Sequence, residues 1–364
     1  MPKLETLTIL LLGAPVLSSL LILMVGKSGL ANKWISSLSS ALTLALAAII
    51  AIDYDASATN TIYWKWISLG GDSIDLVFDY SNVTLPLLLI VTFISFLVQV
   101  YSIGFFLWDA HQSRYFATLG FFTFSMIALT LSGNLLQLFV FWELVGMSSY
   151  LLISFYRNKP EAAKAGTKAL IMNKIGDAGF IVALMVIYFI SGNLDISNIS
   201  TTTIPANYKI LIGVGLLLAA FSKSAQFPFH SWLPDAMEGP TPVSALIHSA
   251  TMVATGVFLL VRLQFLLTSE LLQLVAAIGA TTAILGGINA LRESDLKKLL
   301  AWSTISQLGL MMMVIGNSGF ESAYVHLLSH AIFKAGLFLT VEIMLRLSDG
   351  GGNRRGAPHV AARK

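Results

Sequence analysis

The stretch that decides the fold reads GVGLLLAAFSKSAQFPFHSWLPDAMEGPTP over residues 213–242. An apolar run ends at Lys223, and Pro228 follows it. Because proline lacks a backbone N–H donor, the helix should break just past the charge. A broken helix survives in a bilayer only where protein or a water-filled cavity satisfies the freed backbone groups. Lys223 is therefore a candidate functional residue, and the alternative is a lysine at a helix end that snorkels to the headgroups.

The composition places this stretch in a polytopic membrane protein. Hydrophobic residues make up 56% of the chain and charged residues 11%, and the charged share is about half that of soluble domains. The net charge of +3 includes no basic block, so we expect no nucleic-acid partner. The sequence has no cysteine, which excludes disulfides, thiolate metal sites and bound iron–sulfur clusters.

Long apolar runs recur along the whole sequence. A transmembrane span needs roughly 20 apolar residues, and the chain offers about eleven such runs. We therefore expect an all-α polytopic helix bundle, with a short hairpin in the polar segment 53–80. The first run is too long for a cleavable signal peptide. The predicted spans are 7–25, 34–52, 83–106, 115–131, 135–155, 165–190, 210–226, 243–267, 271–291, 299–315 and 322–345.

Lysine and arginine gather in alternate loops, which predicts an N-terminus outside and a positive inner face. The inner loop 227–241 is the exception, because it has three prolines and no lysine or arginine. We expect that loop to be packed, irregular structure. The segment 348–364 is glycine-rich and basic, and its composition predicts a disordered tail.

Three of the ionisable residues inside the fifth and sixth predicted spans are candidates for a functional role. A lone carboxylate at Glu143 would protonate in an apolar run, so we expect a cation beside it, and Lys223 is the natural partner. The alternative is a purely structural ion pair between two helices. Lys174 and Asp177 share one helix face at i,i+3, which allows either mutual neutralisation or a functional role.

His248 lies inside the eighth predicted span, with Ser244, Thr251 and Thr255 at helical spacing around it. A lone histidine is usually a satisfied core residue, but this stripe of hydroxyls suits a water-lined proton route. In the loop, His230, Asp235 and Glu238 are expected to be structural. Glu342, near the inner end of the last predicted span, is expected to lie at the membrane interface.

A second polar stripe lies in the last predicted span. His326, His330 and Lys334 recur every four residues and cover about 12 Å of one helix face. Because imidazole exchanges protons near neutral pH, the stripe predicts a proton relay. A zinc site is the alternative, since i,i+4 histidines fit zinc, but no third ligand is evident nearby. We expect no metal and no cofactor in this chain.

These motifs resemble those of the antiporter-like subunit L of respiratory complex I (NADH:quinone oxidoreductase), which is chain 5 in mitochondria. Cation/proton antiporters and membrane-bound hydrogenases share several of the motifs. The matching stretches are FWELVGMSSYLLI at 141–153, NKIGDAG at 173–179, SKSAQFPFHSWLPDAMEGPTPVSALIH at 222–248, STISQLG at 303–309 and HAIFKA at 330–335.

The resemblance implies roles for the same residues. It implies a switchable ion pair between Glu143 and Lys223, a lateral link at His248, and a central hydrophilic axis that includes the stripe ending at Lys334. It also places Asp177 near the boundary with the next antiporter-like subunit. It implies that the chain interacts with the other membrane subunits of the complex, with the lipid bilayer and with the protons that it moves. It also implies a location in an energy-transducing membrane, such as the bacterial inner or plasma membrane.

The family fold implied by the resemblance has three leading spans followed by two inverted five-span repeats. An internal match supports a duplication, because DAGFI at 177–181 corresponds to KAGLF at 334–338. The chain departs from the family pattern after about Leu345, where the second broken helix is missing. We expect leading spans in 1–110, a first repeat in 111–267, a partial second repeat in 268–347 and the atypical tail in 348–364.

The function expected from these features is proton translocation by a membrane subunit of a redox-driven enzyme, with electron transfer and quinone chemistry carried out by other subunits. One alternative is a subunit of a cation/proton antiporter driven by ion gradients alone. Another is an inactive, truncated chain that acts only as a scaffold.

Overall fold

The computed structural model describes residues 2–26, 29–56, 60–69, 72–106 and 111–348. The expected tail falls on residues outside this part of the chain, apart from Ser348. The long helices are α1 Pro2–Val25, α2 Gly29–Ile52, α3 Thr84–Phe105, α4 Gln112–Leu131, α5 Leu135–Ile153, α6 Pro160–Ser191, α8 Ala206–Lys223, α12 Ser269–Arg292, α13 Leu296–Gly316 and α14 Phe320–Ser348. The short elements are β1 Thr61–Leu69, β2 Asp72–Asp79, α7 Ile196–Thr201, α9 Trp232–Asp235, α10 Thr241–Ile247, α11 Ala254–Arg262 and the 3-10 helices Phe229–Ser231, Ala236–Glu238 and Gln264–Leu266.

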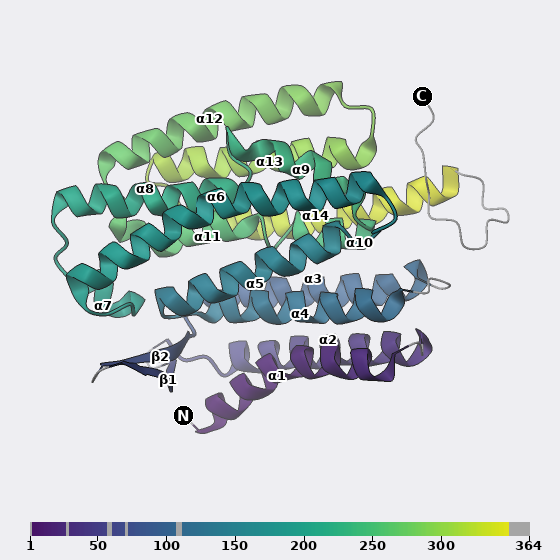
Figure 1. The fold of residues 1–364 in the computed structure, drawn as a ribbon, viewed down its shortest axis with the longest axis horizontal. Coiled ribbons are helices and arrows are strands. Elements are labelled where there is room, and N and C mark those ends of the chain that lie inside the picture. Colours follow the sequence, from purple (N-terminus) through teal and green to yellow (C-terminus); the bar gives the residue numbers. More distant parts are fainter. Residues whose placement is uncertain (1, 27–28, 57–59, 70–71, 107–110, 349–364) are drawn as a thin grey trace.

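The long helices run roughly parallel to one another (Figure 1). The hairpin β1–β2 and the short helix α7 lie at one end of the bundle, and the C-terminal end of α14 lies at the other. We call these the hairpin end and the opposite end. The pair α1–α2 forms the edge of the bundle farthest from α12.

Ten of the described helices are long and apolar enough to cross a membrane, and they match ten of the predicted spans. The predicted hairpin within 53–80 is confirmed, since β1 and β2 pair antiparallel. Arg262 at the end of α11 ties this hairpin to the bundle: its guanidinium donates to Asp79 Oδ2 at 3.1 Å and to the Thr130 carbonyl at 3.3 Å. The hairpin therefore holds the C-terminal end of α11 in place.

The predicted span 243–267 is wrong as one continuous helix. It consists of α10 and α11, which are separated by turns at 248–253. In this break Ser249 donates to the Ala245 carbonyl and Thr251 donates to the Leu246 carbonyl, at 2.5 and 2.6 Å. Such side chain-to-backbone bonds compete with helical pairing, and buried protein can satisfy a break that lipid could not. The apolar composition of the span does not reveal it.

The predicted break after Lys223 is confirmed, because α8 ends at that residue. Ala225 then adopts a φ of 49°, a left-handed conformation that is uncommon outside glycine. The neighbouring groups find partners within the protein: Gln226 N–H donates to the Phe221 carbonyl at 2.8 Å, and Trp232 Nε1 donates to the Ser222 carbonyl at 3.0 Å. Trp232 is fully buried, so the loop 227–241 is packed as predicted.

Helices α6 and α8 approach each other closely through glycines. A Cβ on Gly215 would lie 2.4 Å from the carbonyl oxygen of Gly179 on the facing helix. Small residues at a membrane helix interface allow such backbone contact. This contact brings the middle of α6, with its charged residues, against the end of α8.

Candidate functional site

Lys223 lies at the centre of the candidate site, and it is buried rather than directed to the membrane surface. Its side chain is at the break after α8 and the residue is 1% exposed, which excludes snorkelling. Its ammonium donates to the Trp142 carbonyl at 3.2 Å and lies 5.3 Å from the centre of the Trp142 ring. Within the described residues no carboxylate forms an ion pair with it.

The expected contact between Glu143 and Lys223 is not found. Glu143 forms its ion pair with Lys174 of α6 instead. Consecutive residues of a helix point about 100° apart, so Trp142 faces α8 while Glu143 turns toward a partly open side of α6. Glu143 and Asp177 nevertheless lie within electrostatic range of Lys223.

Asp177 forms no direct ion pair with Lys174 in the described part of the chain, although the two groups lie within electrostatic range of each other. It is 2% exposed and accepts a hydrogen bond from Trp142 Nε1 at 2.6 Å. Trp142 therefore contacts Lys223 through its carbonyl and Asp177 through its indole. The sequence analysis missed this tryptophan, although its place directly before Glu143 was a signal.

His248 directly follows α10, at the break between α10 and α11. The residue is fully buried, and neither ring nitrogen has a hydrogen-bond partner among the described residues. Its ring lies 5.8 Å from that of Phe338 on α14. Of the expected hydroxyl stripe, Thr251 and Thr255 donate to backbone carbonyls. The Ser244 hydroxyl has no hydrogen-bond partner among the described residues.

The predicted stripe on α14 is confirmed as one face of a continuous helix. His326 Nε2 lies 2.9 Å from Gln307 Oε1, and Lys334 donates to Ser303 Oγ at 2.9 Å and to the Leu300 carbonyl at 3.4 Å. His330 and Lys334 are both fully buried. The two ring nitrogens of His330 lack partners in the described part of the chain, an arrangement that ordered water satisfies in proteins.

No set of three or more metal-binding side chains gathers anywhere among the residues that the structure describes. In the loop, His230 packs between the rings of Phe227 and Trp302, at 6.0 and 5.9 Å. Burial holds the pKa of His230 below its usual value, and the nearby Lys168 acts in the same direction. Asp235 forms an ion pair with Lys168, with 2.7 Å between Oδ2 and Nζ, and this pair ties α6 to the loop.

Glu342 was expected at the membrane interface, but the structure places it in a buried contact. It is 7% exposed, and Thr241 Oγ1 donates to its carboxylate at 2.6 Å. The helix α10 packs against α14 at this level and covers the carboxylate. Hydropathy along a single helix cannot show such coverage by a distant segment.

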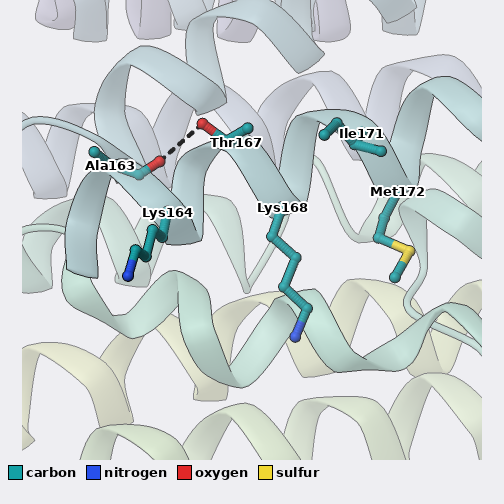
Figure 2. A pocket seen from close by; sticks show the side chains of 6 residues that line it. All are labelled: Ala163, Lys164, Thr167, Lys168, Ile171 and Met172. Carbon is teal, nitrogen blue, oxygen red and sulfur yellow. Dashed lines mark hydrogen bonds between the residues drawn. The ribbon is translucent and has the colours of Figure 1, made fainter. Parts of the chain in front are cut away.

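A surface hollow of about 480 Å³ lies on the first half of α6. Lys164 and Lys168 point to the same side of the helix there (Figure 2). Lys168 also donates to the Ser231 carbonyl at 3.0 Å, so its ammonium serves the packing of the loop. The hollow contains none of the predicted site residues and is lined by Ala163, Lys164, Thr167, Lys168, Ile171 and Met172.

Two family models match the chain. The one described as "NADH:quinone oxidoreductase/Mrp antiporter, TM" covers residues 132–350. The one described as "NADH-Ubiquinone oxidoreductase (complex I), chain 5 N-terminus" covers residues 66–116. Together they include every residue of the candidate site.

Curated relatives match most of this chain but only part of their own length. The chain is 41% identical over 344 residues to NAD(P)H-quinone oxidoreductase subunit 5, chloroplastic, of Anthoceros angustus, covering 89% of this chain and 47% of the relative. It is 43% identical over 320 residues to NADH-ubiquinone oxidoreductase chain 5 of Rhizopus stolonifer, covering 87% and 49%. The chain thus spans about half the length of these relatives.

Solved structures share the fold. A chain of the Mrp complex from Dietzia sp. superimposes with a TM-score of 0.83 at 29% identity, covering 96% of this chain and 38% of that one. A chain of the membrane-bound sulfane sulfur reductase, an archaeal respiratory membrane complex, gives a TM-score of 0.81 at 23% identity, covering 93% and 71%. The second likeness concerns the fold alone.

Proposed function

Because the chain belongs to the NADH:quinone oxidoreductase/Mrp antiporter transmembrane family, we propose that it translocates protons as a membrane subunit of a redox-driven NADH:quinone oxidoreductase. The names of the relatives at 41% and 43% identity support this choice within the family. In this proposal, the residues of this chain bind and pass protons, and other subunits carry out the electron transfer.

The observation that carries the proposal is the state of two buried lysines. Lys223 and Lys334 are at most 1% exposed, and in the described part of the chain neither forms an ion pair with a carboxylate. Within the described residues, the hydrogen bonds that their ammonium groups donate go to carbonyl and hydroxyl oxygens. An unpaired charge inside a membrane is costly, so a lysine in such a place holds a proton that a small change in surroundings can release.

Side chains between the two lysines support a route for that proton. His248 lies within electrostatic range of Lys334, and His330 lies one helical turn from Lys334 on the same face. Both imidazoles are buried, and their ring nitrogens have no hydrogen-bond partner within the described ranges. We place proton release at Lys223, transfer through His248, and acceptance by Lys334, with His330 and His326 continuing the file along α14.

The ion pair of Glu143 with Lys174 supports a switch for the release step. When Glu143 leaves Lys174 and approaches Lys223, it stabilises the proton on Lys223. When it returns to Lys174, Lys223 loses that stabilisation, which at about 4 Å and an effective dielectric of 20 amounts to about 4 kcal/mol. Asp177 lies on the other side of Trp142 and is also within electrostatic range of Lys223.

The same pair supports a protein partner on the α5–α6 face. The side chains of Lys174 and Glu143 are 51% and 24% exposed, although both lie in the middle of membrane-crossing helices. Lipid tails cannot satisfy such charges. We therefore place a neighbouring membrane subunit, of the antiporter-like kind, against this face.

The alternative function is that of a cation/proton antiporter subunit. The 29% identity and the TM-score of 0.83 to a chain of the Dietzia Mrp complex favour it. Such a protein would move protons in exchange for another cation, without NADH oxidation.

Purification through a tag on this chain tests the proposal. The chain, extracted from its native membrane in mild detergent, should bring with it subunits that oxidise NADH with quinone. After reconstitution in liposomes, NADH should drive proton uptake without sodium. Sodium-dependent proton movement without NADH would instead establish the antiporter. A preparation that shows neither activity would leave only the scaffold role.

A further inference from the structure

The polar file on α14 continues beyond Lys334. Every fourth residue from His326 onward forms a series that ends at Glu342 and consists of positions 326, 330, 334, 338 and 342. Four-residue spacing keeps side chains on neighbouring parts of one helix face. Phe338 is the single apolar member of the series, between Lys334 and Glu342.

Glu342 lies where this file approaches the opposite end of the bundle. Its carboxylate accepts a hydrogen bond from Thr241 at the start of α10. Lys297, at the start of α13, donates to the carbonyls of Met237 and Gly239 at 2.6 and 2.9 Å, and it lies within electrostatic range of Glu342. Segments from α10, α13 and α14 thus enclose one carboxylate that is 7% exposed.

His248 lies beside Phe338, the one residue in this series that cannot carry a proton. Glu342 and Lys334 are eight residues apart, about 12 Å along the helix, which is too far for direct proton transfer. The ring of His248 packs on Phe338 at 5.8 Å. It is within electrostatic range of both Lys334 and Lys297, and Lys297 is in turn within electrostatic range of Glu342.

From this geometry we propose that Glu342 is the proton-uptake group of this chain at the opposite end of the bundle. The carboxylate binds a proton from the aqueous phase at that end and becomes a carboxylic acid. It then gives the proton to neutral His248, which passes it to Lys334 in its amine form, and the carboxylate is restored. This step rests on the proposed function, because it delivers protons to Lys334, which that function makes the proton acceptor.

A purely structural role for Glu342 makes a different prediction. In that role the carboxylate only fastens α10 to α14 through Thr241. Glu342→Gln keeps an oxygen that can accept the Thr241 hydroxyl but cannot carry a proton as a carboxylic acid does. Thr241→Val removes the hydroxyl and keeps both the carboxylate and the shape of the side chain, so the two variants separate fastening from proton uptake.

The experiment measures NADH-driven proton uptake by the reconstituted complex, with assembly checked by the yield of complex purified through this chain. Glu342→Gln should slow proton uptake at least tenfold, and Glu342→Asp should recover part of the rate. Thr241→Val should change it less than twofold. Glu321→Gln, which alters an exposed carboxylate in the first turn of the same helix, should leave it unchanged.

Two outcomes would overturn the inference. One is a normal rate for assembled Glu342→Gln, and the other is an equal loss for Glu342→Gln and Thr241→Val. Lys334→Ala is measured beside them. If Lys334→Ala abolishes uptake while Glu342→Gln does not, the inference fails and the proposed function stands. If Lys334→Ala also transports normally, the proposed function itself is wrong.

Discussion

Gly146 controls the position of the Lys223 ammonium, and replacing it with alanine tests whether that position matters. Gly146 lies one helical turn after Trp142, whose carbonyl accepts the Lys223 hydrogen bond. A Cβ at Gly146 would lie 2.8 Å from Lys223 Nζ. The missing side chain of Gly146 therefore leaves the Trp142 carbonyl open to the lysine.

The size of the effect follows from these distances. A normal van der Waals contact is about 3.5 Å or more, so Nζ would have to move by about 0.7 Å. Its bond to the Trp142 carbonyl is already 3.2 Å long, and such a shift away from α5 breaks it. Hydrogen bonds to charged groups contribute about 1.5–3 kcal/mol. The population of the conformation in which Lys223 donates to the Trp142 carbonyl should therefore fall by about 10-fold to 100-fold.

The assay is NADH-driven proton uptake in proteoliposomes, and Gly146→Ala should lower its rate about tenfold or more. The fold should tolerate the change, because alanine favours a helix over glycine by about 0.5–1 kcal/mol and the clash is with the end of a flexible side chain. Gly336→Ala is the matched control, since a Cβ there meets nothing within 4 Å. Equal transport by the two variants would show that the hydrogen bond from Lys223 to the Trp142 carbonyl is not important for transport.

Three further predictions concern stability. Trp142→Phe removes the indole N–H that donates to Asp177 at 2.6 Å and leaves a buried acceptor unpaired, which costs about 1–3 kcal/mol of stability. The Tm of the purified complex should therefore fall, and an unchanged Tm would contradict this. Gly215→Ala places a Cβ 2.4 Å from the Gly179 carbonyl oxygen, and such overpacking destabilises a protein by about 1–3 kcal/mol. The yield of assembled complex should fall, whereas a normal yield would show that α6 and α8 can separate. Burial, with Asp75 nearby, raises the pKa of half-buried Asp195, so the protonated form favours the folded loop and this contribution is lost as pH rises above about 4. Hydrogen-exchange protection of the Ile196 N–H, which donates to the Gly133 carbonyl, should then decrease from pH 3.5 to 6 after correction for intrinsic rates, and Asp195→Asn should remove this dependence.

Patterns local to one helix were predictable from the sequence. The break after Lys223 followed from the charge and Pro228, and the stripe ending at Lys334 followed from four-residue spacing. Both depend only on helix geometry and on proline chemistry. The hairpin within 53–80 was recognisable because a polar segment rich in turn residues separates two apolar runs.

Contacts between helices were less predictable. The sequence shows two lysines that could pair with Glu143, and only the angular offset of Glu143 from Trp142, together with the packing of α5, selects Lys174. The break at His248 was hidden because hydroxyl-to-backbone bonds, rather than proline, accompany it. The position of Glu342 near the end of α14 predicts a place at the membrane interface, because nothing within α14 shows that α10 covers it.

The central claim, that Lys223 carries transported protons, is tested most directly by the number of protons taken up per NADH oxidised in reconstituted complex. Lys223→Ala is compared with Lys209→Ala, which removes a lysine from the first turn of the same helix α8. The proposed function predicts a lower ratio of protons to NADH for Lys223→Ala, with normal assembly, and an unchanged ratio for Lys209→Ala. An assembled Lys223→Ala complex with the unaltered ratio would contradict the claim.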